Sequence, residues 1–156
     1  MMKTKKNEFK IVQIGKIVTN VTGNYLEIFE EYRDALLELE NYSHLHVYWW
    51  ANEFDNKKHR EVLITDIPYA KIKTKAGVFA CRSPERPNLI METVCNIVGI
   101  NKSKGRIFIK NIDAFSDTPI IDIKPYIGVT DRVKNYKVPK WFPSEWGEWV
   151  PKNGIT

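Results

Sequence analysis

The chain has 156 residues, of which 43% are hydrophobic and 28% charged, and its formal net charge is +5. This composition favours one globular domain and argues against a disordered chain, and the apolar runs are too short to span a membrane. The basic balance is compatible with an anionic partner without requiring one.

The two cysteines, Cys81 and Cys95, together with a start that lacks an apolar leader segment, indicate reduced thiols in a cytoplasmic protein. We expect residues 1–9 to form a flexible N-terminus and residues 10–132 to form one domain. Residues 133–156 are predicted to be a tail, rich in proline and tryptophan, that packs on the domain or on a dimer partner.

Alternation of apolar and polar residues, which is typical of strands, dominates the chain. One short helix is predicted over residues 30–39, where Tyr32, Leu36 and Leu39 recur at helical spacing. Strands are predicted over residues 11–18, 25–29, 43–50, 77–82, 90–100, 106–110 and 118–124, with a hairpin at 101–105. Many short strands with one helix predict a mainly β protein, a small β-barrel. Strands do not alternate with helices and no glycine-rich phosphate loop occurs, which argues against a Rossmann fold.

In the strand over residues 43–50, one face is apolar and the other carries histidines and aromatic residues. The first set is Leu45, Val47 and Trp49, and the second is His44, His46, Tyr48 and Trp50. The His-x-His spacing occurs in metal sites, but a third ligand at a fitting spacing is lacking. We therefore expect no metal, and we expect His44 to line a polar pocket.

The segment Arg82-Ser83-Pro84-Glu85-Arg86-Pro87-Asn88 is the most informative part of the sequence. Its two prolines restrict the backbone, so the loop is expected to be rigid. It would then hold two guanidinium groups and an amide at the end of a strand. Because guanidinium groups bind carboxylates and phosphates in a bidentate way, we predict an anion-binding loop.

A second polar cluster is Asp122-Ile123-Lys124-Pro125-Tyr126. Asp122 and Lys124 are expected on one face of their strand together with Ile120, opposite Ile121 and Ile123. Taken alone, this cluster is better interpreted as a solvated strand end with a local ion pair. Next to the arginine loop, it is better interpreted as part of a functional site.

These segments together resemble the TsaA-like family, the core domain of the TrmO-type tRNA methyltransferases. The resemblance rests on Gly77 to Asn88 and on Asp117-Thr118-Pro119 followed by Asp122 to Tyr126, with support from residues 14–17 and 43–47. It covers roughly residues 10–132, and the blocks occur in the family's order. After the arginine loop the chain reads Leu89-Ile90-Met91-Glu92, where the family usually has Pro-Ile-Gly-Leu.

The resemblance implies a non-Rossmann β-barrel that binds S-adenosylmethionine near the interface of a homodimer. It implies cofactor contacts from Arg82, Ser83, Arg86, Asn88 and His44. Asp122 is then the first candidate for a general base, and Lys124 and Tyr126 would position substrate or cofactor.

The reaction implied by the resemblance is N6-methylation of threonylcarbamoyl-adenosine next to the tRNA anticodon. The expected partner is therefore tRNA, and we expect binding neither to DNA nor to a membrane. The chain resembles the short branch of the family, and two alternatives stay open. One is a methyltransferase that acts on a small molecule, and the other is a non-catalytic barrel that binds S-adenosylmethionine or RNA.

Overall fold

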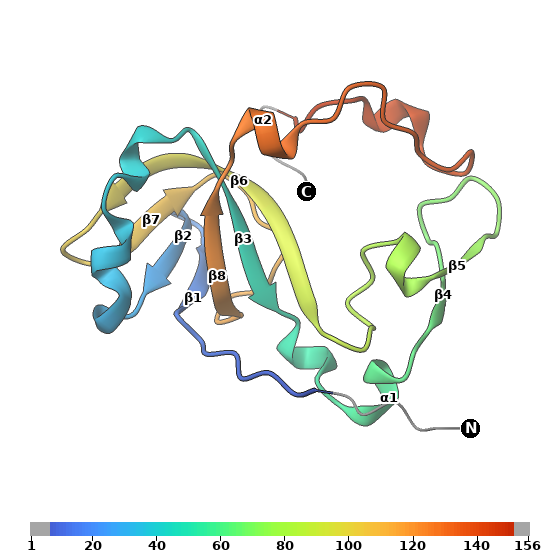
Figure 1. The fold of residues 1–156 in the computed structure, drawn as a ribbon, viewed down its shortest axis with the longest axis horizontal. Helices are drawn as coiled ribbons and strands as arrows, with labels where there is room; N and C mark the ends of the chain where they lie inside the picture. The colour runs from blue at the N-terminus through green and yellow to red at the C-terminus, as the bar shows by residue number, and fades with distance from the viewer. Residues whose placement is uncertain (1–6, 152–156) are drawn as a thin grey trace.

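The computed structural model describes residues 7–151. Six antiparallel strands close into a barrel in the order β1, β2, β7, β6, β3 and β8 (Figure 1). They are β1 (Gly15–Asn20), β2 (Gly23–Ile28), β3 (His44–Trp50), β6 (Ile90–Asn101), β7 (Arg106–Ile109) and β8 (Pro119–Pro125). Closure pairs both sides of every one of these strands, which removes the exposed edges that favour aggregation. The predicted small β-barrel is confirmed.

Helical segments in the described part of the chain have three to seven residues. A helix is present where one was predicted over residues 30–39, but it is of the 3-10 type and ends at Leu36. A second 3-10 turn, Leu39–Asn41, follows after Glu38, whose φ is +66°. Leu36 and Leu39 both pack in the core, and the left-handed backbone at Glu38 separates the two helical segments that carry them. The remaining helical segments are Asn52–Phe54, α1 (Lys57–Arg60), Val78–Ala80, α2 (Gly128–Asp131) and Ser144–Trp146. Among residues 7–151, no helix is both long and apolar enough to cross a bilayer.

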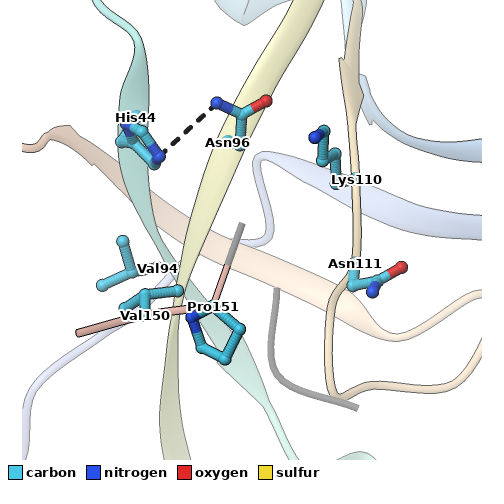
Figure 2. Close-up of a pocket in the computed structure, with 7 residues that line it drawn as sticks. All are labelled: His44, Val94, Asn96, Lys110, Asn111, Val150 and Pro151. Carbon is cyan, nitrogen blue, oxygen red and sulfur yellow. Dashed lines mark hydrogen bonds between the residues drawn. The ribbon is translucent and has the colours of Figure 1, made fainter. Parts of the chain in front are cut away.

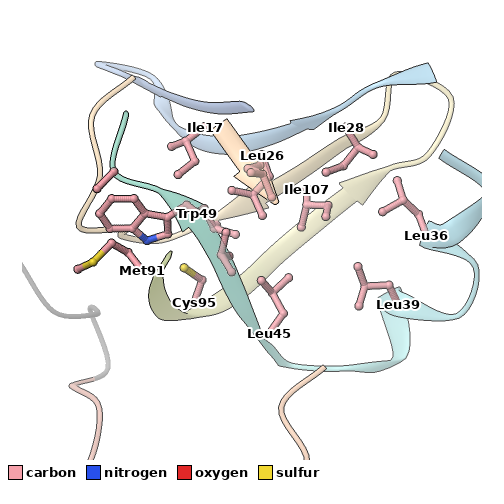
Figure 3. Packing of buried hydrophobic residues seen from close by; sticks show 14 of the residues in the cluster. Ile17, Leu26, Ile28, Leu36, Leu39, Leu45, Trp49, Met91, Cys95 and Ile107 are labelled. Carbon is pink, nitrogen blue, oxygen red and sulfur yellow. The ribbon is translucent and has the colours of Figure 1, made fainter. Parts of the chain in front are cut away.

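Alternate strand residues fill the inside of the barrel, and Figure 3 shows part of this core. Fully buried members include Ile17, Leu26, Leu45, Val47, Ile107 and Ile120. Burial of one such side chain stabilises the fold by about 1.5–3 kcal/mol. The indole Nε1 of Trp49 donates a 3.1 Å hydrogen bond to Thr93 Oγ1, which satisfies two polar groups inside the core. The predicted inward face of β3 is confirmed.

The predicted faces of β8 are confirmed for Asp122 and Lys124, which pair with outer-face residues of β3, and for Ile123 opposite them, but they are wrong for Ile120 because the strand contains a bulge. Tyr48 pairs with Asp122 and the next residue of β3, Trp49, pairs with Ile120, so that Ile121 is an additional residue in β8. Ile120 is therefore fully buried, whereas Asp122 lies in the row of Tyr48, a residue of the outer face. Ile123 packs against the core, contrary to strict alternation from Ile120.

A side lobe lies next to the barrel and is built from two distant segments (Figure 1). Strands β4 (Ile64–Asp66) and β5 (Lys75–Gly77) form a separate two-stranded sheet. Tyr69, in the loop between them, contacts Trp141, Phe142 and Trp146 of the tail, with ring centroids 6.1, 6.3 and 4.9 Å away. Lys71 Nζ lies 3.2 Å from a carboxylate oxygen of Glu145. The tail thus packs on this loop. The predicted flexible residues 1–9 lie mostly outside the described part of the chain.

Candidate functional site

The outer face of β8, β3 and β6 carries a continuous set of polar and aromatic side chains. Strand pairing arranges them in cross-strand rows, because residues opposite one another on paired strands point to the same face. The rows are Asp122–Tyr48–Glu92, Lys124–His46–Val94, and His44–Asn96, next to which lies Tyr126. The outer positions predicted for His44, His46 and Tyr48 on β3 agree with this arrangement.

His46 lies at the centre of this face and contacts carboxylates on both sides. Its Nδ1 is 2.6 Å from Glu92 Oε1, and its Nε2 is 3.3 Å from Asp131 Oδ2. The ring stacks on Tyr48 and on Tyr126, with centroids 6.2 and 5.6 Å away and interplanar angles of 18° and 20°. Stacking on two sides fixes the plane of the imidazole, and the carboxylates fix its rotation.

Asp131 belongs to α2, whose position brings this carboxylate over the barrel face. Its Oδ2 also accepts a 2.6 Å hydrogen bond from the backbone N–H of Ile127. This hydrogen bond lowers the pKa of Asp131, and the contact with His46 lowers it further.

Asp122 and Lys124 form a close ion pair on the same face. Asp122 Oδ1 also accepts a 2.9 Å hydrogen bond from the backbone N–H of Ile123. The hydrogen bond to Asp122 raises the pKa of Lys124, whose ammonium group lies 5.1 Å from the ring centroid of Tyr48. Burial raises the pKa of Tyr48, and the nearby carboxylate of Glu92 raises it further. Both carboxylate oxygens of Asp122, the predicted general base, therefore already accept hydrogen bonds.

The two arginines of the predicted anion-binding loop have different surroundings. The side chain of Arg82 is 76% exposed, and its guanidinium group makes long contacts with Glu92, 3.5 Å to the carbonyl oxygen and 3.7 Å to the carboxylate. Arg86 donates instead to the carbonyl oxygens of Val78 and Cys81, at 3.2 Å from the latter. Arg82 is available to a ligand, whereas Arg86 ties the loop to the segment before it.

The strand predicted over residues 77–82 is wrong, because the backbone turns after Gly77. Strand β5 ends at Gly77, and Val78–Ala80 forms a 3-10 turn with Val78 buried. The two hydrogen bonds from Arg86 hold the carbonyl groups of this turn. These hydrogen bonds stabilise a turn in place of an extended strand.

A pocket of about 230 Å³ lies where the arginine loop meets the outer barrel face. It is lined by Tyr48, Arg82, Arg86, Ile90, Met91 and Glu92. Cationic, anionic, aromatic and aliphatic groups thus surround one small volume. We call it the arginine pocket.

The other predicted cofactor residues lie elsewhere. Ser83 Oγ accepts a 3.3 Å hydrogen bond from Glu85 N–H, within the loop itself, and Asn88 is exposed. His44 lines a second pocket, of about 260 Å³, at the opposite end of β3. Tyr48 lies four positions after His44, or about 13 Å further along the strand.

The second pocket is closed on one side by the end of the tail (Figure 2). His44 and Asn96 point toward each other there, with 3.4 Å between His44 Nε2 and Asn96 Nδ2. Its other lining residues are Val94, Lys110, Asn111, Val150 and Pro151. Among the residues that the structure describes, no three His, Cys, Asp or Glu side chains gather in a way that could hold a metal ion.

Sequence analysis missed Glu92, Asp131 and the central role of His46. The alternation Glu92, Val94, Asn96 along β6 could have placed Glu92 on the outer face. Its pairing with β3, and the position of α2 over both strands, depend on tertiary structure.

The family model of the tRNA-methyltransferase O N-terminal domain matches residues 3–132. The chain is 38% identical over 112 residues to a probable S-adenosyl-L-methionine-binding protein of Methanocaldococcus jannaschii, covering 71% of this chain and 86% of that protein. A probable S-adenosyl-L-methionine-binding protein of Archaeoglobus fulgidus is 37% identical over 118 residues, 75% of this chain and 30% of its own length.

The tRNA (adenine(37)-N6)-methyltransferase of Homo sapiens is 34% identical over 112 residues, 72% of this chain and 24% of that protein. The chain thus spans less than a third of the A. fulgidus and human relatives. Among solved structures, TrmO from Pseudomonas aeruginosa superposes with a TM-score of 0.64 at 24% identity, covering 88% of this chain and 64% of the other. At this identity the likeness shows a common fold.

Proposed function

Because the chain belongs to the tRNA-methyltransferase O N-terminal domain family, we propose that it is an S-adenosylmethionine-dependent methyltransferase that acts on tRNA in the cytoplasm. The reaction that we propose is N6-methylation of threonylcarbamoyl-adenosine next to the anticodon. The names of the methyltransferase and S-adenosylmethionine-binding relatives support this reaction and this cofactor.

The observation that carries the proposal is the chemical make-up of the arginine pocket. S-adenosylmethionine has a carboxylate, an ammonium group, a positively charged sulfur and an adenine ring. The exposed guanidinium group of Arg82 suits the carboxylate, the carboxylate of Glu92 suits a positive group, and Tyr48 offers an aromatic surface. The residues present therefore fit this cofactor.

When bound, this cofactor supplies a methyl group that is already activated by its positive sulfur. The residues of the chain then have to align the acceptor and exclude competing orientations. Arg82 would hold the cofactor by its amino-acid end. Lys124 and Tyr126 would orient the acceptor, with Asp122 as the group that positions Lys124.

We also propose that the protein works as a homodimer whose partner completes this pocket. Its volume of about 230 Å³ is below the 300–1,000 Å³ of typical small-molecule sites. Apolar side chains lie exposed beside it, with Ile90 in its lining and Phe79 85% exposed in the turn before the loop. Exposed apolar surface at a site favours burial against another chain. Light scattering at micromolar concentration should give twice the chain mass.

The test of the proposed function is calorimetry with S-adenosylmethionine, followed by transfer of labelled methyl groups to bulk tRNA from cells that lack this chain. Wild-type protein should bind and transfer. Arg82→Ala should weaken cofactor binding by about tenfold to a hundredfold, the equivalent of a charge-assisted hydrogen bond. Lys102→Ala, in the turn between β6 and β7, serves as a matched loss of positive charge.

Cofactor binding with transfer to small amines and not to tRNA would replace the proposed acceptor by a small molecule. Cofactor binding without any transfer would indicate a non-catalytic binding protein. Absence of heat with millimolar cofactor would refute the proposal as a whole.

A further inference from the structure

We infer that residues 132–140, which we call the basic strap, bind the phosphate backbone of tRNA next to the nucleotide that is methylated. The inference rests on the proposed function and deepens it, because it names the surface that holds the acceptor.

The basic strap carries most of the excess positive charge of the chain. Its sequence is Arg132-Val133-Lys134-Asn135-Tyr136-Lys137-Val138-Pro139-Lys140, with four cationic residues and no acidic one. The formal net charge of the whole chain is +5, so this segment alone accounts for +4. Such a local excess favours an anionic partner at this place on the surface.

The position of the basic strap relates it to the acceptor side of the candidate site. Asp131, the residue before it, lies against His46, with 3.3 Å between Asp131 Oδ2 and His46 Nε2. His46 pairs across strands with Lys124, which we propose to orient the acceptor. From α2 the basic strap runs to the side lobe (Figure 1), where the rings of Trp141 and Tyr69 lie 6.1 Å apart. Contacts at both ends therefore hold the basic strap in place relative to the acceptor.

The side chains of the basic strap are available to a partner. All nine residues are exposed. Among residues 7–151, no carboxylate lies within ion-pair distance of Arg132, Lys134, Lys137 or Lys140. Lys71 of the side lobe differs, because its Nζ lies 3.2 Å from a carboxylate oxygen of Glu145. The cations of the basic strap can thus replace the counterions of a phosphate backbone, which is the main source of affinity for nucleic acids.

An aromatic ring lies among these cations. Tyr136 is 51% exposed, and in the described part of the chain its ring stacks on no other ring. It follows a turn at Asn135, whose φ is +55°. Cations that follow a backbone, together with rings on which bases stack, are the means by which proteins bind unpaired nucleotides. Nine residues span at most about 30 Å, a length over which several phosphates of one strand can lie.

An anionic membrane is the other large surface that basic and apolar side chains could bind. Segments that lie on membranes are typically amphipathic helices. No residue of the basic strap is helical, and the segment starts next to the acceptor side of the site. These two observations favour RNA.

The test variant combines Lys134→Gln, Lys137→Gln and Lys140→Gln. It leaves Arg132 unchanged, because this residue adjoins Asp131. Binding of bulk tRNA from cells that lack this chain is measured by filter retention at several salt concentrations. The slope of log affinity against log salt concentration should decrease by about two to three, roughly one for each phosphate contact that is lost. Affinity at the lowest salt concentration should fall at least about tenfold.

A matched control removes the same charge elsewhere on the surface. It combines Lys58→Gln in α1 with Lys102→Gln and Lys104→Gln in the turn between β6 and β7, all of them exposed residues. The salt slope of this control should stay within about one of the wild-type slope. Both triple variants should unfold at the wild-type urea concentration, because exposed side chains contribute little to stability.

Methyl transfer from labelled S-adenosylmethionine gives a second readout. The strap variant should raise the KM for tRNA at least about tenfold, whereas the rate at saturating tRNA should fall less than about threefold. Its affinity for S-adenosylmethionine should equal that of wild type.

Two variants of Tyr136 test the stacking separately from the charge. Tyr136→Ala should weaken tRNA binding by about fivefold to a hundredfold with an unchanged salt slope, as expected for loss of one stacked base. Tyr136→Phe keeps the ring and should bind within about threefold of wild type.

The outcomes separate the inference from the proposed function. Wild-type protein that neither binds tRNA nor transfers methyl groups to it would remove both. Transfer by wild type, with a strap variant that keeps the wild-type affinity and salt slope, would overturn the inference alone. An equal loss of affinity in the matched control would also overturn it, because total charge would then suffice.

Two further measurements identify other occupants of the basic strap. A strap variant with half the wild-type mass in light scattering would make this segment an interface between two copies of the chain. Wild-type binding to phosphatidylserine vesicles that the strap variant loses, with unchanged tRNA affinity, would assign the segment to a membrane. Either result overturns the inference.

Discussion

The two arginines of the predicted anion-binding loop are expected to respond oppositely to truncation. Arg86→Ala removes the donor for two carbonyl groups, those of Val78 and Cys81. A hydrogen bond from a charged group contributes about 1.5–3 kcal/mol, and partial exposure of Arg86 reduces the sum, so that we expect a loss of about 2 kcal/mol. For a chain of this size such a loss lowers the melting temperature by about 4–8 °C. Arg82→Ala should change stability by less than about 0.5 kcal/mol, because its side chain is 76% exposed.

Urea unfolding followed by tryptophan fluorescence measures both variants, with the slope of the transition as a check that the unfolded state is comparable. Calorimetry with S-adenosylmethionine then compares their affinities. We expect Arg82→Ala to be stable and weak in binding, and Arg86→Ala to be less stable, with weaker binding because the loop loses its attachment. An Arg86→Ala protein as stable as wild type would refute this reasoning. Its guanidinium group would then be available to a ligand, and the roles of the two arginines would have to be exchanged.

Three further predictions concern stability and reactivity. Gly105→Ala should cost about 2 kcal/mol or more in urea unfolding, because φ at this position is +63° and the new Cβ would lie 2.5 Å from a backbone oxygen. The hydrogen bond from Arg60 lowers the pKa of Asp55, so this carboxylate stabilises the fold above its ordinary pKa of 3.8, and the contribution is lost as pH falls through the lower folded value. Asp55→Asn should therefore flatten the loss of stability in acid, as measured by melting curves against pH. Burial raises the pKa of Cys95 to about 12, so a thiol reagent at about pH 8 should label native protein at the partly exposed Cys81 and leave Cys95 unmodified until unfolding.

The barrel could be predicted from sequence because its strands follow strict local patterns. In β3, alternate residues go to the core and to the outer face as expected, and the turn after β6 falls at the predicted hairpin. Period-two alternation reports only the local backbone. It failed in β8, where one additional residue, Ile121, reverses the faces on either side. Nothing in the alternation of that segment marks the bulge.

The site was harder to predict than the barrel, because it depends on contacts between residues that are separated in the sequence. The arginine loop was recognised from its residues, but Arg86 forms its hydrogen bonds to the turn before it. Glu92 was noted only as part of the departure from the family's usual residues after the arginine loop. Its importance follows from pairing with β3, which places it next to His46, and from α2, which adds Asp131. These are relations between segments far apart in the chain.

The contact between Tyr69 and the tail has a consequence for how the chain can vary. The family match ends at residue 132, whereas Trp141, Phe142 and Trp146 lie beyond it. Truncation after residue 132 would keep all six barrel strands and leave Tyr69 without these three aromatic neighbours. Shortening the loop that carries Tyr69 would in turn expose the aromatic residues of the C-terminal segment to water. The two regions are therefore expected to be gained or lost together in evolution.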